Sequence, residues 1–207
     1  MKVEDWGTID YRQAYDRQKQ AVAEVIAGGH ERLIFCEHTP VLTLGRMFKP
    51  GSLLYSAQEI AALGVPVYPV DRGGDVTLHA PGQQVVYPIV DLNRHGRDLK
   101  GYLQKLEQIA VDLLMDFGIL AVGIPGRRGV FVGQDKIVSI GVGVRKWVTY
   151  HGMGINVSTD LSLFRLIKPC GLDVRMTSVA RVANKMVPMT LVRENLIKQF
   201  ANKFSAT

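Results

Sequence analysis

The sequence predicts an α+β fold in which helices flank a mixed, largely antiparallel sheet. Stretches with apolar residues at helical spacing alternate with short β-branched runs that glycine and proline separate. The chain of 207 residues shows no internal repeat, no low-complexity segment and no linker. We therefore predict a single domain over residues 1–207.

The composition is typical of a globular protein. Hydrophobic residues make up 47% of the chain and charged residues 21%, and the mean hydropathy is +0.08. No run approaches the roughly 18 apolar residues of a membrane span, and residues 1–6 lack the apolar core of a secretory signal, so we expect a cytoplasmic protein. The net charge of +6 and the pI near 9.4 favour acidic partners, among them acidic proteins, phosphorylated cofactors and nucleic acid.

The first predicted elements are a helix and two short strands. Apolar residues recur at helical spacing over residues 11–26, and a Gly-Gly pair follows. Residues 33–36 and 41–44 are typical of short strands. Cys36 lies inside the first strand, where a cysteine is usually a small buried hydrophobe, whereas the role of His38 is open.

A short helix and a strand lead into a glycine-rich segment. Ser56 and Glu59 have the spacing of a capping box, which predicts a helix that ends near Gly64. Residues 65–70 predict a strand that leads into the glycine-rich segment, and residues 85–90 predict the buried strand that follows it.

The longest amphipathic helix is predicted in the second half of the chain. Asp98 can cap a helix over residues 99–117, which we expect to cover the sheet. The remaining predicted elements are a hairpin of residues 129–133 and 136–144, a strand at 147–157, a helical turn at 161–167 and an amphipathic helix at 190–204.

The glycine-rich segment 72–88 carries polar residues suited to a binding site. Glycines at positions 73, 74 and 82 allow the backbone to approach a ligand closely or to take a positive φ. The side chains that can bind an acidic or carbonyl group and transfer a proton are Arg72, Thr77, His79 and Gln83. The alternative is a tight glycine turn with a solvated arginine and a satisfied histidine.

Cys170 and Lys136 are the candidates for nucleophilic chemistry. Pro169 and Gly171 place Cys170 on an irregular loop, where a thiol is more accessible than inside a strand. A nearby cation lowers the pKa of a thiol from ~8.5, so a cysteine and a lysine make a sensible nucleophilic pair. Lys136 falls at a predicted hairpin turn, however, where a lysine is most often a solvated edge residue.

Several other site types lack their sequence signals. The chain has no phosphate-binding loop, no dinucleotide-binding glycine motif, no C-x-x-C pair and no H-E-x-x-H helix. Cys36 and Cys170 form neither a disulfide framework nor a clustered metal-ligand pattern. We therefore predict free thiols and no metal site.

Residues 72–87 match the pattern R-G-G-x-x-T-x-H-x-x-G-Q-x-V-x-Y at every specified position. In this segment the chain resembles the lipoyl(octanoyl) transferase family, the octanoyl-[acyl-carrier-protein]:protein N-octanoyltransferases. Ala80 stands where that family commonly has glycine, and Met153-Gly154 where Leu-Ala is usual. The resemblance covers most of the chain, through residues 37–46, 129–133, 136–141, 151–152 and 169–171.

The resemblance implies a fold similar to the catalytic domain of biotin and lipoate protein ligases. It also implies an acyltransferase that moves an octanoyl (or lipoyl) group from acyl carrier protein to a lysine of lipoyl domains, through a cysteine acyl-thioester and without a nucleotide or other cofactor. The donor would be octanoyl-acyl carrier protein. The acceptors would be lipoyl domains of 2-oxoacid dehydrogenase complexes and the glycine cleavage H protein.

The resemblance also assigns roles to individual residues. Cys170 matches the nucleophile of the family, and Lys136 matches the lysine that lowers the pKa of the thiol and assists proton transfer. His79 is a second candidate for proton transfer. The residues that match substrate-binding segments are Arg72, Gly73, Gly74, Asp75, Val76, Thr77, Leu78, His79, Ser139, Ile140, Gly141, Gly152, Met153 and Gly154.

Two alternatives compete with this interpretation. An ATP-dependent lipoate or biotin protein ligase would share the fold but would need no cysteine nucleophile, so the Pro-Cys-Gly loop argues against it. A basic RNA-binding module would use residues 127–128 and 145–147, but the basic residues are dispersed and lack an aromatic stacking pattern. We therefore predict neither a nucleic-acid nor a membrane partner.

Overall fold

The structure is a computed structural model that describes residues 1–168 and 174–204. Its strands are β1 Lys2–Ile9, β2 Arg32–His38, β3 Val41–Leu44, β4 Val67–Pro69, β5 Val76–His79, β6 Gln83–Ile89, β7 Val122–Ile124, β8 Arg127–Val132, β9 Asp135–Arg145 and β10 Val148–Asn156. Its α-helices are α1 Tyr11–Ile26, α2 Ala57–Ala62, α3 Leu99–Asp116, α4 Val179–Ala183 and α5 Met189–Phe204. Short 3-10 turns form at η1 Pro50–Ser52, η2 Leu92–His95 and η3 Leu161–Leu166.

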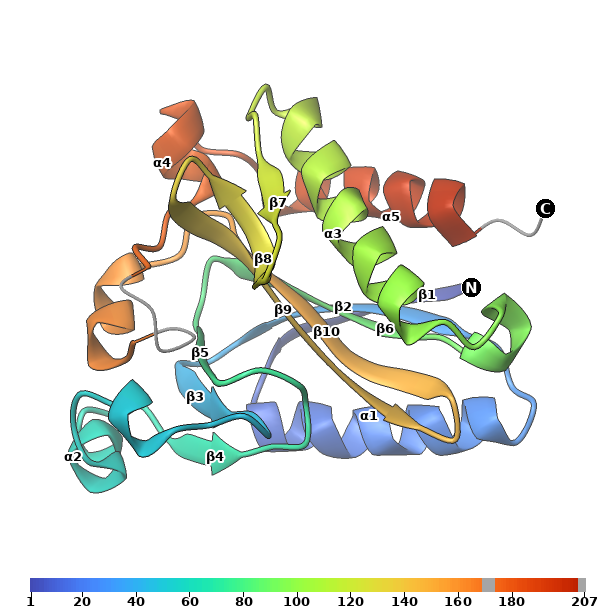
Figure 1. Cartoon of the computed structure of the whole chain (residues 1–207), viewed down its shortest axis with the longest axis horizontal. Helices are drawn as coiled ribbons and strands as arrows, with labels where there is room; N and C mark the ends of the chain where they lie inside the picture. Colours follow the sequence, from blue (N-terminus) through green and yellow to red (C-terminus); the bar gives the residue numbers. More distant parts are fainter. Residues whose placement is uncertain (169–173, 205–207) are drawn as a thin grey trace.

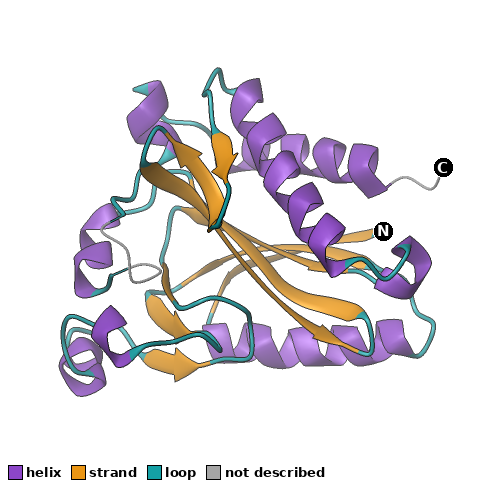
Figure 2. Cartoon of the chain, in the orientation of Figure 1, coloured by secondary structure: helices purple, strands orange, loops and turns teal. Residues whose placement is uncertain are grey.

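The strands form two sheets, with the helices on the outside (Figures 1 and 2). The large sheet has seven strands in the order β1-β2-β6-β10-β9-β8-β7, and the small sheet has three in the order β4-β3-β5. Only the β1–β2 and β3–β4 pairs are parallel among these strands. The predicted α+β class with a largely antiparallel sheet is therefore confirmed.

Helices cover both faces of the large sheet. The helix α1 lies along one face, and α3 crosses the opposite face with α5 beside it (Figure 1). Strands β6 and β10 are buried along their whole length because both of their faces are covered. As expected, Cys36 on β2 is a fully buried member of the cluster under α1.

The caps that the sequence predicts are present. The Ser56 hydroxyl accepts a hydrogen bond from the Glu59 N–H, and the Glu59 carboxylate accepts one from the Ser56 N–H. The Asp98 carboxylate accepts a hydrogen bond from the Gly101 N–H at the start of α3. Gly118 has φ +74° just beyond the end of this helix, as expected of a glycine that follows a helix.

Four of the described helices and strands, namely β1, β5, β7 and α4, were not predicted from the sequence. Strand β1 carries no continuous apolar face, and its position depends on parallel pairing with β2. Strand β7 and helix α4 are too short for periodicity to reveal them. The middle of the glycine-rich segment forms β5, which pairs with β3 and which the glycine pattern did not indicate.

No helix within the described ranges is long and apolar enough to cross a membrane.

Candidate functional site

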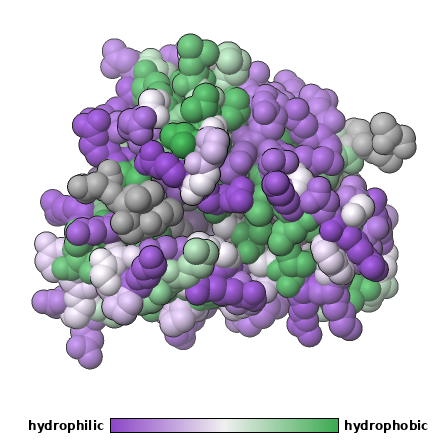
Figure 3. Space-filling model, viewed as in Figure 1, coloured by the Kyte–Doolittle hydropathy of each residue, from purple (hydrophilic) through white to green (hydrophobic). Residues whose placement is uncertain are grey.

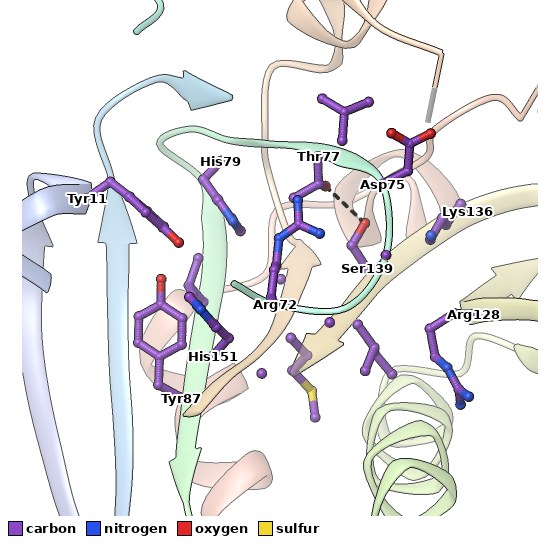
Figure 4. Close-up of a pocket in the computed structure, with 18 residues that line it drawn as sticks. Tyr11, Arg72, Asp75, Thr77, His79, Tyr87, Arg128, Lys136, Ser139 and His151 are labelled. Carbon is purple, nitrogen blue, oxygen red and sulfur yellow. Dashed lines mark hydrogen bonds between the residues drawn. The ribbon is translucent and has the colours of Figure 1, made fainter. Parts of the chain in front are cut away.

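A pocket lies between the glycine-rich segment and the centre of the large sheet (Figure 4). Its walls come from residues 72–79 and from β6, β9 and β10. The empty space between the lining residues is about 620 Å³, including the open mouth. The predicted substrate-binding residues that line it are Arg72, Gly74, Asp75, Val76, Thr77, His79, Ser139, Ile140, Gly141, Gly152, Met153 and Gly154.

Glycines allow the backbone segments around the pocket to approach one another. A Cβ atom on Gly141 would lie 2.8 Å from the carbonyl oxygen of Gly73, and one on Gly152 would lie 2.2 Å from that of Val86. The Gly73 N–H donates a 2.8 Å hydrogen bond to the Val142 carbonyl, which ties the glycine-rich segment to β9. The glycine pattern thus marks close backbone approaches at the pocket wall.

Strand β5 presents alternate residues to opposite sides. Thr77 lines the pocket and donates a 3.4 Å hydrogen bond to the Ser139 hydroxyl (Figure 4). Leu78 belongs to the apolar cluster beneath the small sheet. Neither Leu78 nor Gly73 is among the described pocket-lining residues, so the structure does not bring all the predicted binding residues together.

Arg72 is a buried cation beside the pocket. Its side chain is held by Thr43, whose hydroxyl accepts from Nε (3.2 Å) and Nη2 (2.9 Å) and whose carbonyl accepts from Nη2 (2.6 Å). A Cβ atom on Gly45 would lie 2.8 Å from Nη1, so that glycine makes room for the guanidinium. Because Arg72 is only 7% exposed, the alternative of a solvated arginine is wrong.

His79 is buried and is held in one orientation by Gln83. The Gln83 amide nitrogen donates to the Leu78 carbonyl and to Asn156 Oδ1, so its oxygen is the acceptor for His79 Nδ1 at 2.7 Å. Burial lowers the pKa of His79 to about 3, and the nearby Arg72 cation adds to this effect. The imidazole is therefore neutral near pH 7, with its Nε2 as an acceptor.

Lys136 lies inside the pocket wall and not at a solvated edge as its place in the sequence suggested. It is only 4% exposed. Its backbone N–H donates to the Arg175 carbonyl at 2.8 Å, and its carbonyl accepts from the Thr177 N–H at 2.9 Å. The hairpin pattern could not reveal this burial, because residues 175–177 come from a distant part of the sequence.

Gly129 gives the Lys136 side chain its space. It has φ +119°, and a Cβ atom there would lie 2.6 Å from Lys136 Cε and 2.4 Å from the Val138 carbonyl oxygen. The Lys136 Nζ lies 5.9 Å from the centroid of the Phe131 ring. A side chain at position 129 would therefore displace the lysine.

Cys170, the predicted nucleophile, lies outside the described residues. The described residues on either side of that part of the chain are anchored next to the pocket. The Lys168 N–H donates to the Ser52 carbonyl at 2.8 Å, and the Ser52 hydroxyl donates to the carboxylate of Asp75. On the other side, Arg175 is bonded to Lys136 as described above. Cys36 is buried, and its burial raises the pKa of the thiol, as expected for an inert cysteine.

The pocket also contains residues that the sequence did not indicate as part of an acyl-transfer site. They are Tyr11, Val85, Tyr87, Arg128 and His151. Residues 151–152 belong to the part of the sequence that resembles the family, and this was a signal for His151. Tyr11 matched only the apolar spacing of a helix.

His151 belongs to a hydrogen-bonded cluster around Asp71. Its Nε2 lies 3.0 Å from Asp71 Oδ1, which also accepts from the Tyr15 hydroxyl at 2.9 Å. The Tyr150 hydroxyl donates to Asp71 Oδ2 at 2.6 Å. The bond from His151, followed by those from the two tyrosines, holds the pKa of Asp71 well below its usual range, against its partial burial. Burial lowers the pKa of His151, so a neutral imidazole donates to the carboxylate.

Three buried imidazoles make stability depend on pH. Burial lowers the pKa of His38, His79 and His151 below the ordinary value of 6.5. Below pH 6.5 the unfolded chain binds protons that the folded protein does not, so this stability is complete above pH 6.5 and falls as the pH drops toward about 3, the folded pKa of His79. Each imidazole should contribute up to about 1.4 kcal/mol per pH unit.

Urea unfolding between pH 7.5 and 4.5 would measure this dependence. The free energy of unfolding should decrease steadily below pH 6.5, and His79→Gln should reduce the slope. His30→Gln, at an exposed position, is the matched control. A free energy of unfolding that is constant or rises as the pH falls would contradict the expectation.

The arrangement of sheets and helices is that of a lipoate protein ligase catalytic domain. The structure superimposes on lipoate-protein ligase A bound with ATP with a TM-score of 0.80 at 16% identity, covering 98% of this chain and 84% of that one. At that identity the likeness shows the fold alone. Residues 10–201 match the family model of the lipoyl protein ligase A/B catalytic domain, and the chain belongs to this family.

Relatives named octanoyltransferase align with most of this chain. The one from Geotalea uraniireducens is 46% identical over 173 residues, covering 83% of this chain and 78% of that one. The one from Geobacter metallireducens is 41% identical over 202 residues, covering 97% of this chain and 92% of that one.

Proposed function

We propose that this chain transfers an octanoyl (or lipoyl) group from acyl carrier protein to a lysine of lipoyl domains. The observation that carries the proposal is the 41% identity to an octanoyltransferase over 97% of the chain. The acceptors would be lipoyl domains of 2-oxoacid dehydrogenase complexes and the glycine cleavage H protein. We expect the reaction to take place in the cytoplasm and to use no cofactor.

Cys170 is the proposed nucleophile. Its thiolate attacks the carbonyl carbon of the donor thioester, and the donor thiolate leaves with a proton from Lys136. The acceptor amine then attacks the acyl-cysteine, its proton passes back to Lys136, and the Cys170 thiolate leaves. Each step exchanges one bond to the acyl carbon for another, so no nucleotide is needed to activate the acyl group.

The burial of Lys136 supports its proposed role. Lys136 is only 4% exposed, so the effective dielectric constant around its ammonium is lower than in water. In such a site a positive charge lowers the pKa of a neighbouring thiol more strongly than it would in water. Residues 168 and 175, which flank Cys170, are anchored to Ser52 and Lys136, at the wall of the same pocket. This proximity supports the pairing of Cys170 with Lys136.

The surroundings of His79 argue against the second candidate for proton transfer. A base works best when its pKa lies near the working pH, and burial lowers that of His79 to about 3. We therefore assign His79 to the shape of the pocket, with its Nδ1 held by Gln83.

The apolar part of the pocket suits an acyl chain. Val76, Val85, Ile140 and Met153 line it, and the glycines of β9 and β10 leave room beside them. Burial of an apolar chain there stabilises the complex by about 0.8 kcal/mol per methylene group. This supports a medium-length fatty acyl group as the transferred unit.

The ATP-dependent ligase is the alternative to test. In nucleotide-free buffer we expect octanoyl transfer from octanoyl-acyl carrier protein to a lipoyl domain. Intact-mass analysis of the enzyme mixed with donor alone should show a covalent octanoyl adduct. Strict dependence on ATP, with free octanoate as the only usable donor, would overturn the proposal in favour of a ligase.

A further inference from the structure

A groove with an apolar floor lies beside the described chain ends at Lys168 and Val174. Its open space is about 970 Å³. The floor is formed by the buried side chains of Phe164, Ile167 and Met176. The groove therefore offers apolar surface to a partner.

The rim of the groove is basic. Its exposed cations are Arg165, Lys168, Arg175 and Arg181, and no acidic residue lines the groove within the described chain. The acidic residues nearby are Asp160, which interacts with Arg165, and Asp135, which pairs with Arg175 at 3.1 Å. Figure 3 shows hydrophilic and hydrophobic side chains next to each other at the left of the molecule, the side on which α4 lies in Figure 1.

These cations are available to a partner. The Arg175 side chain is 85% exposed despite its ion pair with Asp135. Exposed pairs of this kind contribute only about 0–1 kcal/mol, so an acidic partner can compete for the arginine.

We propose that this groove docks the acidic carrier protein that delivers the acyl thioester. The inference rests on the proposed function and adds the donor's binding surface to it. A basic rim attracts an acidic protein surface and accelerates its association. Arginine also binds phosphate groups in a fork geometry, and the pantetheine arm of an acyl carrier protein is attached through a phosphate.

The charge of the groove distinguishes the donor from the acceptor. The acceptor brings a lysine side chain, whose ammonium would be repelled by four cations around one opening. The donor brings negative charge next to its thioester arm. The groove therefore suits the negatively charged arm of the donor better than the acceptor lysine.

The groove also lies next to the proposed reaction centre. Lys168 on its rim is hydrogen-bonded to Ser52, whose hydroxyl donates to the pocket residue Asp75. Arg175 on its rim is hydrogen-bonded through its backbone to Lys136. A protein bound in the groove is thus beside the wall of the pocket that its acyl group must enter.

Charge reversal at the rim tests this assignment. The Arg165→Glu/Arg181→Glu variant should lower kcat/KM for octanoyl-acyl carrier protein at least tenfold relative to kcat/KM for octanoyl-pantetheine, which lacks both protein and phosphate. The salt dependence of the reaction with the protein donor should also become weaker. Arg165→Gln/Arg181→Gln removes the charges without adding new ones and should have a smaller effect in the same direction.

A variant with two exposed lysines reversed is the matched control. The variant Lys100→Glu/Lys198→Glu changes one exposed lysine on α3 and one on α5. In Figure 1, α5 is on the opposite side of the molecule from η3. This control lowers the formal net charge from +6 to +2, as the rim variant does. The ratio of the two specificity constants should remain within about twofold of the wild type, because this control leaves the charges around the groove unchanged.

Three outcomes would overturn the inference. The rim variant could leave the ratio of the two donors unchanged, or the control could lower it equally, which would indicate an effect of net charge. The rim variant could instead raise KM for the lipoyl domain, which would assign the groove to the acceptor. If the wild type transfers octanoyl from neither donor, the proposed function itself fails, and this inference fails with it.

Discussion

Replacing Lys136 with methionine is expected to lower kcat/KM for octanoyl transfer by about 100-fold or more. Methionine fills much of the space of the lysine side chain, so the contacts around Gly129 are largely kept while the charge and the proton are lost. Proton transfer by a positioned side chain typically contributes about 10²–10⁴-fold to a rate. The same variant should raise the pH at which Cys170 reacts with iodoacetamide, because an ammonium no longer stabilises the thiolate.

Alkylation is best measured in a Cys36→Ala background, which leaves Cys170 as the only thiol of the chain. Cys36 is fully buried, so this change should reduce stability but preserve turnover. Abolished acylation in a folded Cys36→Ala protein would instead make Cys36 the reacting cysteine.

Lys136→Arg separates the two roles of the lysine. Arginine keeps the positive charge but, with a pKa above ~12, cannot release and recover a proton. It should therefore preserve the low alkylation pH without restoring turnover. If alkylation of Cys170 has the same pH dependence in the wild type and in folded Lys136→Met, Lys136 does not tune the thiol.

Gly152→Ala is expected to destabilise the fold by about 3 kcal/mol or more. Overpacking a tight site commonly costs about 1–3 kcal/mol. At Gly152 the obstructing atoms belong to the next strand, since the new Cβ would lie 2.2 Å from the Val86 carbonyl oxygen and 2.7 Å from Pro88 Cδ. Strands β10 and β6 would have to separate at the centre of the large sheet. Urea unfolding measures the effect.

Gly73→Ala is the matched control. A Cβ atom at Gly73 would meet only the Val142 carbonyl oxygen at 3.6 Å, which is ordinary contact. The free energy of unfolding should therefore change by less than about 1 kcal/mol. Similar stabilities for the two variants would show that the close approach at Gly152 does not restrict the side chain.

The sequence determined the long elements and the region of the site. Helical spacing with local caps defined α1 and α3, because helix formation depends on residues within one or two turns of each other. Apolar, β-branched runs defined β2, β3, β6 and β10. The glycine pattern from Arg72 to Gly82 marked the segment that forms a wall of the pocket.

The identity of the candidate catalytic residues depended on resemblance to a family. Local pattern favoured a solvated Lys136 and left Arg72 and His79 open between binding and turn structure. The pairing of Cys170 with Lys136 across 34 positions has no local signal, so it stays a proposal that the experiments above can test.

Only the tertiary structure decided which charged groups are buried. Residues 175–177 cover Lys136, Thr43 holds Arg72, and Asp71 joins His151 across 80 positions in the sequence. Periodicity reflects residues a few positions apart, so it does not reveal a segment from a distant part of the sequence that packs against them. Burial and the pKa shifts that follow from it depend on such segments, and they set the electrostatics of this pocket.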